Sequence, residues 1–244
     1  MVKDQGTTSF NSGQSRARFF GQDQGQPSPA SMMLELVNIS HSYSKIPALK
    51  GINLQIRSSE FIFVTGASGA GKSTLLSVIS GEVRPTHGSI MHGRENLFVT
   101  QVFQDLKLLE NLSVLENLRL AHDPSVYRSD REFMEVMVEM AKVFGVYDAL
   151  HRRVRDLNGG LKQKVAIMRA LLPGPDLLVA DEPTSALDFE SSKKLFDVLT
   201  YYNSKRALSI IWASHNRELV RKFSGKMVHL EKGLLVHSGH ACFI

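Results

Sequence analysis

The sequence predicts an α/β fold with a parallel sheet at its centre and a helical segment inserted into it. Phe61–Thr65 reads F-I-F-V-T, a short β-favouring run that leads into a glycine-rich loop and then an apolar, helix-like stretch. Residues 177–180 are a fully apolar strand candidate and residues 209–214 a second one with an apolar centre between two serines, as expected for strands that are buried on both faces. Between these two parts, residues 133–144 carry apolar side chains at helical spacing.

The N-terminal end differs in composition from the rest of the chain. Residues 1–32 are rich in Gly, Ser and Gln and show neither helical nor strand periodicity, which predicts a disordered tail. A folded domain is then expected over residues 33–240. It begins with a strand at 34–39 and a second strand in which Ile52, Leu54 and Ile56 alternate with polar residues.

Further strands are predicted after the glycine-rich loop. Residues 89–92 and 98–103 have strand character and follow a turn at 84–88. Near the end of the chain, residues 227–230 and 234–236 are separated by Lys232-Gly233 and are expected to form a closing hairpin.

The middle of the chain predicts a helical insert of about 40 to 50 residues, placed at about 106–160. Ser129 and Glu132 have the spacing of a capping box, and Gly145 is expected to end the helix. The buried stripe of this helix is predicted to contain Phe133, Val136, Met137, Met140, Val143 and Phe144.

The glycine-rich loop, G-A-S-G-A-G-K-S-T, has the composition of a phosphate-binding loop. Glycines let backbone N–H groups approach the phosphates, a lysine reaches the terminal phosphates, a serine hydroxyl binds Mg²⁺, and a helix N-terminus favours the negative charge. A chance match in a surface turn is the alternative, and the strand before and the helix after the loop argue against it. The nucleotide-binding residues are predicted to be Gly66, Ala67, Ser68, Gly69, Ala70, Gly71, Lys72, Ser73 and Thr74.

Four more side chains have the chemistry that hydrolysis of a γ-phosphate needs. Asp181 is a candidate Mg²⁺ partner, and Glu182 is a candidate base or water-orienting group. Gln104 would bridge Mg²⁺ and water, and His215 would contact the γ-phosphate. Each has a structural alternative: the two carboxylates as helix caps, the glutamine as an exposed loop amide, and the histidine as a neighbour of a helix N-terminus. Gln101 is a rival to Gln104.

Composition limits the remaining choices. The chain has 244 residues, of which 43% are hydrophobic, which suffices for one large domain or two packed subdomains. No run approaches the roughly 18 apolar residues of a spanning helix, so we expect no membrane span and no signal peptide. The only cysteine, Cys242, suits a reducing compartment. The net charge of +5 is spread along the chain and indicates a solvated basic surface rather than a binding patch.

Taken in order, the motifs resemble those of ATP-binding cassette ATPases over about residues 33–237. They are the loop from Gly66 to Thr74 (Walker A), Gln104 (Q-loop), Leu157-Asn158-Gly159-Gly160 (signature), 177–182 (Walker B), Ser185-Ala186-Leu187-Asp188 (D-loop) and His215 (switch histidine). Tyr43 fits the aromatic residue that stacks on adenine in this family. The resemblance implies a P-loop NTPase fold with a RecA-like parallel-sheet core, an antiparallel β subdomain and a helical insert, with ATP and Mg²⁺ as cofactors.

The family also implies a mechanism in a homodimer. Two chains would enclose two ATP molecules, and Asn158, Gly159, Gly160 and Asp188 would act on the nucleotide of the partner subunit. The signature departs from the usual L-S-G-G-Q, because Asn158 replaces Ser and Leu161 replaces Gln. Asparagine still caps a helix and donates from its amide, but leucine forms no side-chain hydrogen bond. We therefore expect a working but slow ATPase.

The resemblance further implies a transmembrane, permease-like partner at the cytoplasmic face of the inner membrane. It would be contacted by the stretch that begins at Leu106 and ends at Leu115, although these leucines equally suit local core packing. Within the family, the loop and the phrase V-F-Q-D-L-K-L-L are most similar to bacterial cell-division ATPases, with lipoprotein-release and macrolide-export ATPases next. A soluble cassette acting on nucleic acid or ribosomes is a third class. The interval from Lys72 to Asn158 lacks sustained heptads, so no nucleic-acid partner is expected.

Overall fold

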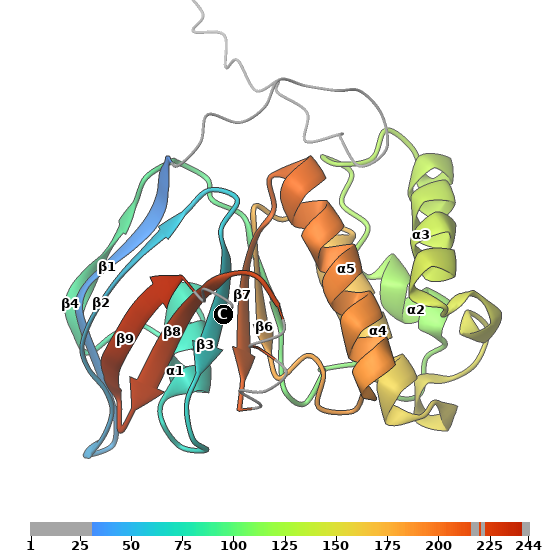
Figure 1. Cartoon of the computed structure of the whole chain (residues 1–244). Coiled ribbons are helices and arrows are strands. Elements are labelled where there is room, and N and C mark those ends of the chain that lie inside the picture. The colour runs from blue at the N-terminus through green and yellow to red at the C-terminus, as the bar shows by residue number, and fades with distance from the viewer. Residues whose placement is uncertain (1–30, 216–219, 221–222, 241–244) are drawn as a thin grey trace, which may run out of the picture.

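The computed structural model describes residues 31–215, 220 and 223–240 (Figure 1). The tail predicted over residues 1–32 lies almost wholly outside the described residues, as does Cys242, and the first strand begins at Met32. The elements are β1 (Met32–Tyr43), β2 (Ile46–Arg57), β3 (Phe61–Thr65), α1 (Lys72–Ile79), β4 (His87–His92), β5 (Val99–Val102), α2 (Val114–Arg119), α3 (Asp130–Phe144), η1 (Tyr147–Ala149), η2 (Val154–Asp156), α4 (Gly159–Leu171), β6 (Leu177–Asp181), α5 (Phe189–Arg206), β7 (Ser209–Ser214), β8 (Lys226–Glu231) and β9 (Leu234–His240).

Two sheets organise the molecule. A six-stranded sheet in the order β5-β6-β7-β3-β8-β9 is parallel except for β9, which pairs antiparallel with β8 as the predicted closing hairpin. A three-stranded antiparallel sheet has the order β2-β1-β4. In Figure 1 the antiparallel sheet lies on the left, the larger sheet in the middle, and α4, α5 and α3 on the right. This is the predicted combination of a parallel core and an antiparallel subdomain.

The central strands separate two apolar cores. In β6, Leu178 and Ala180 face the helices, whereas Leu177 and Val179 face α1 and the antiparallel sheet. Strands β3 and β7 alternate in the same way, which explains why Phe61 to Val64 in β3 and Ile210 to Ala213 in β7 are continuous apolar runs. The carboxyl ends of the parallel strands meet at one edge, where the phosphate-binding loop leaves β3.

The helical segment leaves the sheet after β5 and returns at the neighbouring strand β6. Two details of the predicted helix 129–145 are wrong. The carboxylate of Glu132 accepts a hydrogen bond from the backbone N of Arg128 at 2.7 Å, so the capping box at Ser129 is only half formed. Val143 is 63% exposed and does not belong to the buried stripe. The complete capping box instead begins α2, where Ser113 and Glu116 satisfy each other's backbone N–H groups.

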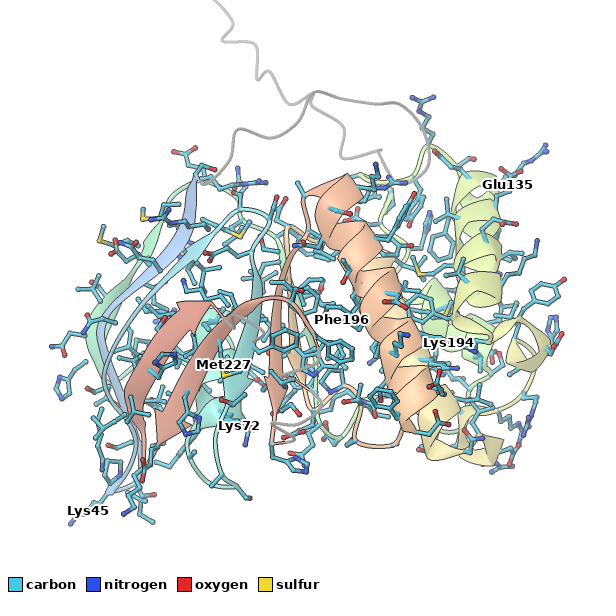
Figure 2. All side chains as sticks on the ribbon, in the orientation of Figure 1. Lys45, Lys72, Glu135, Lys194, Phe196 and Met227 are labelled. Atoms are coloured by element: carbon cyan, nitrogen blue, oxygen red, sulfur yellow. The ribbon has the colours of Figure 1, made fainter. Side chains whose placement is uncertain are left out.

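Helix α5 is fixed to the sheet by aromatic side chains. Phe196 points from α5 toward the central sheet (Figure 2), where its ring stacks on Phe223 at 4.0 Å and lies near Phe61, Phe63 and Trp212. Aromatic rings bury large areas with few rotatable bonds, so this cluster holds α5 rigidly over the sheet. Across the described ranges, no helix combines the length and the apolar character needed to cross a membrane.

Candidate active site

The phosphate-binding loop connects β3 to α1 and is held by two other parts of the chain. A Cβ atom on Gly66 would lie 2.5 Å from the carbonyl oxygen of Leu230, and one on Gly71, where φ is +103°, would lie 2.6 Å from that of Ala48. The backbone N of Gly233 also donates to Ala70 O at 3.0 Å. Glycine is therefore required at both positions because the backbones of β8 and β2 leave no room for a side chain. The phosphates of a nucleotide would also need space at the loop.

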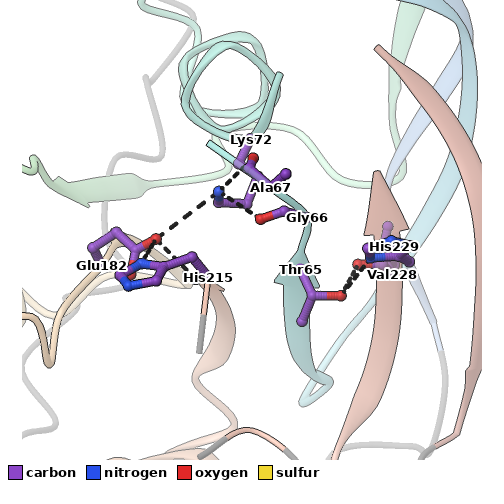
Figure 3. Close-up of polar contacts among 8 residues, drawn as sticks. All are labelled: Thr65, Gly66, Ala67, Lys72, Glu182, His215, Val228 and His229. Carbon is purple, nitrogen blue, oxygen red and sulfur yellow. Dashed lines mark hydrogen bonds and ion pairs between the residues drawn. The ribbon is translucent and has the colours of Figure 1, made fainter. Parts of the chain in front are cut away.

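Lys72 is the first residue of α1, and its ammonium group lies within the loop. Its Nζ donates to the carbonyl oxygens of Gly66 and Ala67 at 3.0 and 3.2 Å (Figure 3). The same atom lies 3.9 Å from Oε1 of Glu182. The lysine thus connects the loop to the end of β6.

Asp181 is the last residue of β6 and Glu182 follows it, as the sequence predicted, and both are buried. Burial raises the pKa of the Asp181 carboxyl, and a hydrogen bond with Ser73 opposes that shift. Glu182 has φ of +52°, an uncommon conformation for a residue with a side chain. Its Oε1 accepts a hydrogen bond from the backbone N of His215 at 2.9 Å and lies 2.9 Å from Nδ1 of the same residue, at ion-pair distance (Figure 3).

The two glutamines after β4 occupy different places. Gln104 is exposed and lines the cavity at the loop. Gln101 lies within β5, away from the cavity lining, and its amide oxygen is buried with no hydrogen-bond partner among the described residues. This arrangement favours Gln104 for the predicted role.

These segments enclose a cavity of about 440 Å³ at the carboxyl edge of the sheet. Of the predicted site residues, Gly66, Ala67 and Ala70 belong to the loop but not to the lining. Ala48 and Ser185 line the cavity without having been predicted as nucleotide ligands. The lining consists of Tyr43, Ala48, Ser68, Gly69, Gly71, Lys72, Ser73, Thr74, Gln104, Asp181, Glu182, Ser185 and His215.

The residues predicted to act on the partner's nucleotide lie outside this cavity. Asn158 caps α4, because its Oδ1 accepts from the backbone N of Leu161 at 2.8 Å. Cβ atoms on Gly159 and Gly160 would lie 3.1 Å from Ala186 and 3.2 Å from Leu187. Asp188 is exposed and caps α5 by accepting from the backbone N of Ser191 at 2.7 Å. The signature segment and the D-loop are therefore packed against each other within one chain.

Gln163 is a buried residue that the sequence analysis missed. Its Nε2 donates to the carbonyl oxygen of Glu182 at 3.2 Å, and its Oε1 accepts from the hydroxyl of Ser185 at 3.4 Å. A glutamine that is 2% exposed in an otherwise amphipathic helix is the kind of buried polar residue that needs partners. From the sequence alone, its position two residues after the atypical Leu161 was the only available signal.

A phosphate-binding loop follows the parallel strand β3, and two carboxylates lie at the carboxyl end of β6, two strands away in the same sheet. This combination defines a P-loop nucleoside triphosphatase. Residues 49–185 match the family described as ABC transporter. The chain belongs to this family and is an ABC ATPase.

Relatives in the family have several cellular roles. The chain is 32% identical over 223 residues to the cell division ATP-binding protein FtsE of Bacillus subtilis, covering 84% of this chain and 95% of that protein. It is 33% identical over 222 residues to the methionine import ATP-binding protein MetN of Helicobacter pylori strain 26695, covering 85% and 68%. It is 30% identical over 212 residues to the zinc uptake ATP-binding protein ZnuC of Bacillus subtilis, covering 82% and 92%.

Solved structures confirm the fold. The ATP-binding cassette MJ0796, solved as a dimer in a post-hydrolysis state bound to ADP and Pi, matches with a TM-score of 0.76 and 28% identity, covering 87% of this chain and 100% of that one. A nucleotide-free ATP-binding cassette from an ABC transporter matches with a TM-score of 0.74 at 20% identity, covering 86% and 91%, which shows the same fold.

Proposed function

We propose that this chain binds and hydrolyses ATP in the cavity at the phosphate-binding loop and uses dimer closure to drive a separate transmembrane partner. The observation that carries this proposal is that one cavity is lined by Lys72, Ser73, Asp181, Glu182 and His215. Lys72 supplies positive charge for the terminal phosphates. Glu182 orients or deprotonates the attacking water, and His215 contacts the γ-phosphate.

Ser73, Gln104 and Asp181 would hold Mg²⁺. They offer a hydroxyl, an amide and a carboxylate, the oxygen donors that Mg²⁺ prefers, and Ser73 and Asp181 already share a hydrogen bond. The ion would neutralise charge on the β- and γ-phosphates.

The other half of each site would come from a second copy of the chain. The first turn of α4, with Asn158, Gly159 and Gly160, would meet the γ-phosphate held by the partner's loop, where a helix N-terminus stabilises negative charge. The dimeric MJ0796 structure supports this arrangement, since it matches the chain at 28% identity. Asp188 would lie at the same interface.

The membrane partner would be contacted through the stretch from Leu106 to Leu115. Leu106, Leu108 and Leu115 pack against the helical core, whereas Leu109 is 49% exposed and is the leucine best placed for such a contact. The stretch is tied to α4, because Lys162 pairs with Glu110 at 2.9 Å and Arg169 donates to Leu106 O at 3.0 Å. The chain would act at the cytoplasmic face of the cell membrane.

The finer role that we favour is that of the cell-division ATPases. The match to FtsE, at 32% identity over 95% of that protein, supports this role. A second candidate is solute import, since MetN and ZnuC are equally similar in identity. Deleting the gene separates the two: a division defect with normal uptake supports the first role, whereas lost uptake of a solute with normal division supports the second.

The test of the enzymatic proposal is Glu182→Gln in the purified chain with its membrane partner. We expect turnover to fall by about 100-fold or more while ATP still binds, because the amide keeps the shape but cannot take a proton. Glu135→Gln, an exposed change on α3, is the matched control and should leave turnover unchanged. Turnover that is unaffected by Glu182→Gln would falsify the proposal.

A further inference from the structure

Gln163 connects the signature helix to the catalytic end of β6. The side chain projects from the second turn of α4 and is 2% exposed. Its amide nitrogen donates to the carbonyl oxygen of Glu182, and its amide oxygen accepts from the Ser185 hydroxyl. Both partners line the nucleotide cavity, although Gln163 itself does not.

The backbone of Glu182 is held in an unfavourable conformation by contacts on both sides. With φ of +52° it lies in the left-handed region, which is unfavourable for a residue with a side chain. Its N donates to Ala213 O at 3.0 Å, and its carbonyl oxygen accepts from Gln163 at 3.2 Å and from Ser185 N at 3.1 Å. Such a conformation persists only where the surroundings fix it.

The direction of the Glu182 side chain depends on this backbone conformation. The carboxylate reaches the backbone N and Nδ1 of His215 at 2.9 Å and Lys72 at 3.9 Å. Rotation about φ of Glu182 would move the carboxylate away from these groups. Gln163 supplies the only side-chain hydrogen bond to the Glu182 carbonyl oxygen among the described residues.

We propose that Gln163 is a positioning residue that sets the orientation of Glu182 in its own chain and couples it to α4. The helix begins with the segment that contacts the partner's nucleotide in the proposed dimer, and Gln163 follows Gly160 by three residues, less than one turn further. If the first turn of α4 shifts when it contacts the partner's nucleotide, Gln163 would move with it and change the orientation of the Glu182 carboxylate in the same chain. The inference rests on the proposed function and adds a regulatory link between the two sites.

The first test is Gln163→Met, which keeps the length of the side chain but removes the donor and the acceptor. We expect kcat for ATP to fall by at least ~10-fold with KM within about 2-fold of wild type, because misplaced catalytic groups affect the transition state and not ground-state binding. Met168→Leu, a volume-conserving change at a fully buried position of the same helix, is the control and should change neither. Unchanged kcat in Gln163→Met, or an equal loss of binding and turnover, overturns the proposal.

Ser185→Ala provides a second variant if Gln163→Met fails to fold. It removes the hydroxyl that orients the glutamine amide and leaves the core packing intact, since Ser185 is exposed. A smaller fall in kcat, of about 3-fold, with unchanged KM is expected. Wild-type kcat in this variant counts against the proposal.

Mixed dimers with two affinity tags decide whether Gln163 acts in its own chain. In one mixed dimer, a chain that carries both Gln163→Met and Glu182→Gln is paired with a wild-type chain, which keeps both Gln163 and Glu182. Turnover of this dimer should equal that of a dimer of one wild-type chain and one Glu182→Gln chain. When the two changes are in separate chains, both sites are damaged and turnover should fall at least ~10-fold further. Greater activity in the separated pair would mean that Gln163 acts on the partner's site, and would overturn the proposal. If wild type itself shows no turnover, it is the proposed function that fails.

Discussion

Oε1 of Glu182 accepts a hydrogen bond from the backbone N of His215 at 2.9 Å and lies 2.9 Å from Nδ1 of the same residue, at ion-pair distance. Glu182 directly follows β6 and His215 directly follows β7, so the contact joins the carboxyl ends of two neighbouring parallel strands. Because the backbone donor does not depend on the imidazole, Glu182 remains attached to β7 even if the ring turns away. The side chain of His215 lines the cavity and is 66% exposed, so its ring has room to turn away from Glu182.

Replacing His215 by Ala should therefore impair turnover without unfolding the site. We expect kcat to fall by about 10² while the affinity for ATP changes little, since Lys72 and the loop remain. Steady-state ATP hydrolysis and equilibrium nucleotide binding measure the two quantities. His151→Ala, at an exposed histidine of the helical segment, is the control, and a similar loss there would contradict a specific role for His215.

Asp181→Asn should stabilise the protein at neutral pH while impairing hydrolysis. Burial raises the pKa of Asp181 in the folded state above its ordinary value near 3.8, so ionisation opposes folding at pH above the folded pKa. A gain of about 1 kcal/mol would raise Tm by roughly 2–4 °C in a chain of this size. The difference should shrink as pH falls through the folded pKa and vanish below the unfolded value, where the carboxyl is neutral in both states.

Thermal melts at several pH values check this prediction. Asp197→Asn, at an exposed position of α5, should leave Tm unchanged throughout. A lower Tm for Asp181→Asn at pH 7 would mean that the attraction of Lys72 and the hydrogen bond from Ser73 outweigh desolvation.

Tyr43 should contribute to nucleotide affinity by stacking on the base. It lines the cavity, is 50% exposed, and its ring is supported by His41 in an edge-on contact at 4.7 Å. Because base–aromatic stacking contributes about 1–3 kcal/mol, Tyr43→Ala should raise the KM for ATP roughly 5- to 100-fold with kcat retained, and Tyr43→Trp should restore it. Tyr201→Ala, at a similarly exposed tyrosine on α5, should have no effect. An unchanged KM in Tyr43→Ala would place the base elsewhere.

Restoring the usual signature should accelerate the enzyme. The side-chain oxygen of Asn158 already accepts a hydrogen bond from the backbone N of Leu161. Leu161 packs against the helical core. Neither the Asn158 oxygen nor the Leu161 side chain is therefore available to contact a nucleotide as Ser and Gln would be in the L-S-G-G-Q pattern. We expect Asn158→Ser with Leu161→Gln to raise kcat several-fold. The accompanying loss of apolar packing should lower Tm slightly. Lower kcat in the double variant would show that the chain is adapted to its own signature.

The sequence was most informative where one physical requirement determined the residues. Strands β3 and β7 have the predicted bounds, because continuous apolar runs bounded by polar residues specify strands that are buried on both faces. The sequence was least informative about which of several possible partners a side chain contacts. Val143 has helical spacing but faces away from the core, and the carboxylate of Glu132 found Arg128 instead of Ser129.

The same limit applies to the site. The residues of one contiguous loop, Lys72 and Ser73 among them, could be assigned from spacing alone. The contribution of Gln163 depends on α4 lying against the turn after β6, which no local pattern encodes. Likewise, the close approach of Ala48 and Leu230 to the loop glycines follows from sheet order and not from any motif.

The contact of Gly66 with Leu230 determines when the site can form during synthesis. The backbone that supports the loop, including the bond from Gly233 N to Ala70 O, is translated about 160 residues after the loop itself. A ribosome-bound chain that ends before β8 would contain every motif for nucleotide binding but lack the strand on which the loop rests. Nascent chains should therefore acquire ATP affinity late and abruptly, only after β8 has been synthesised.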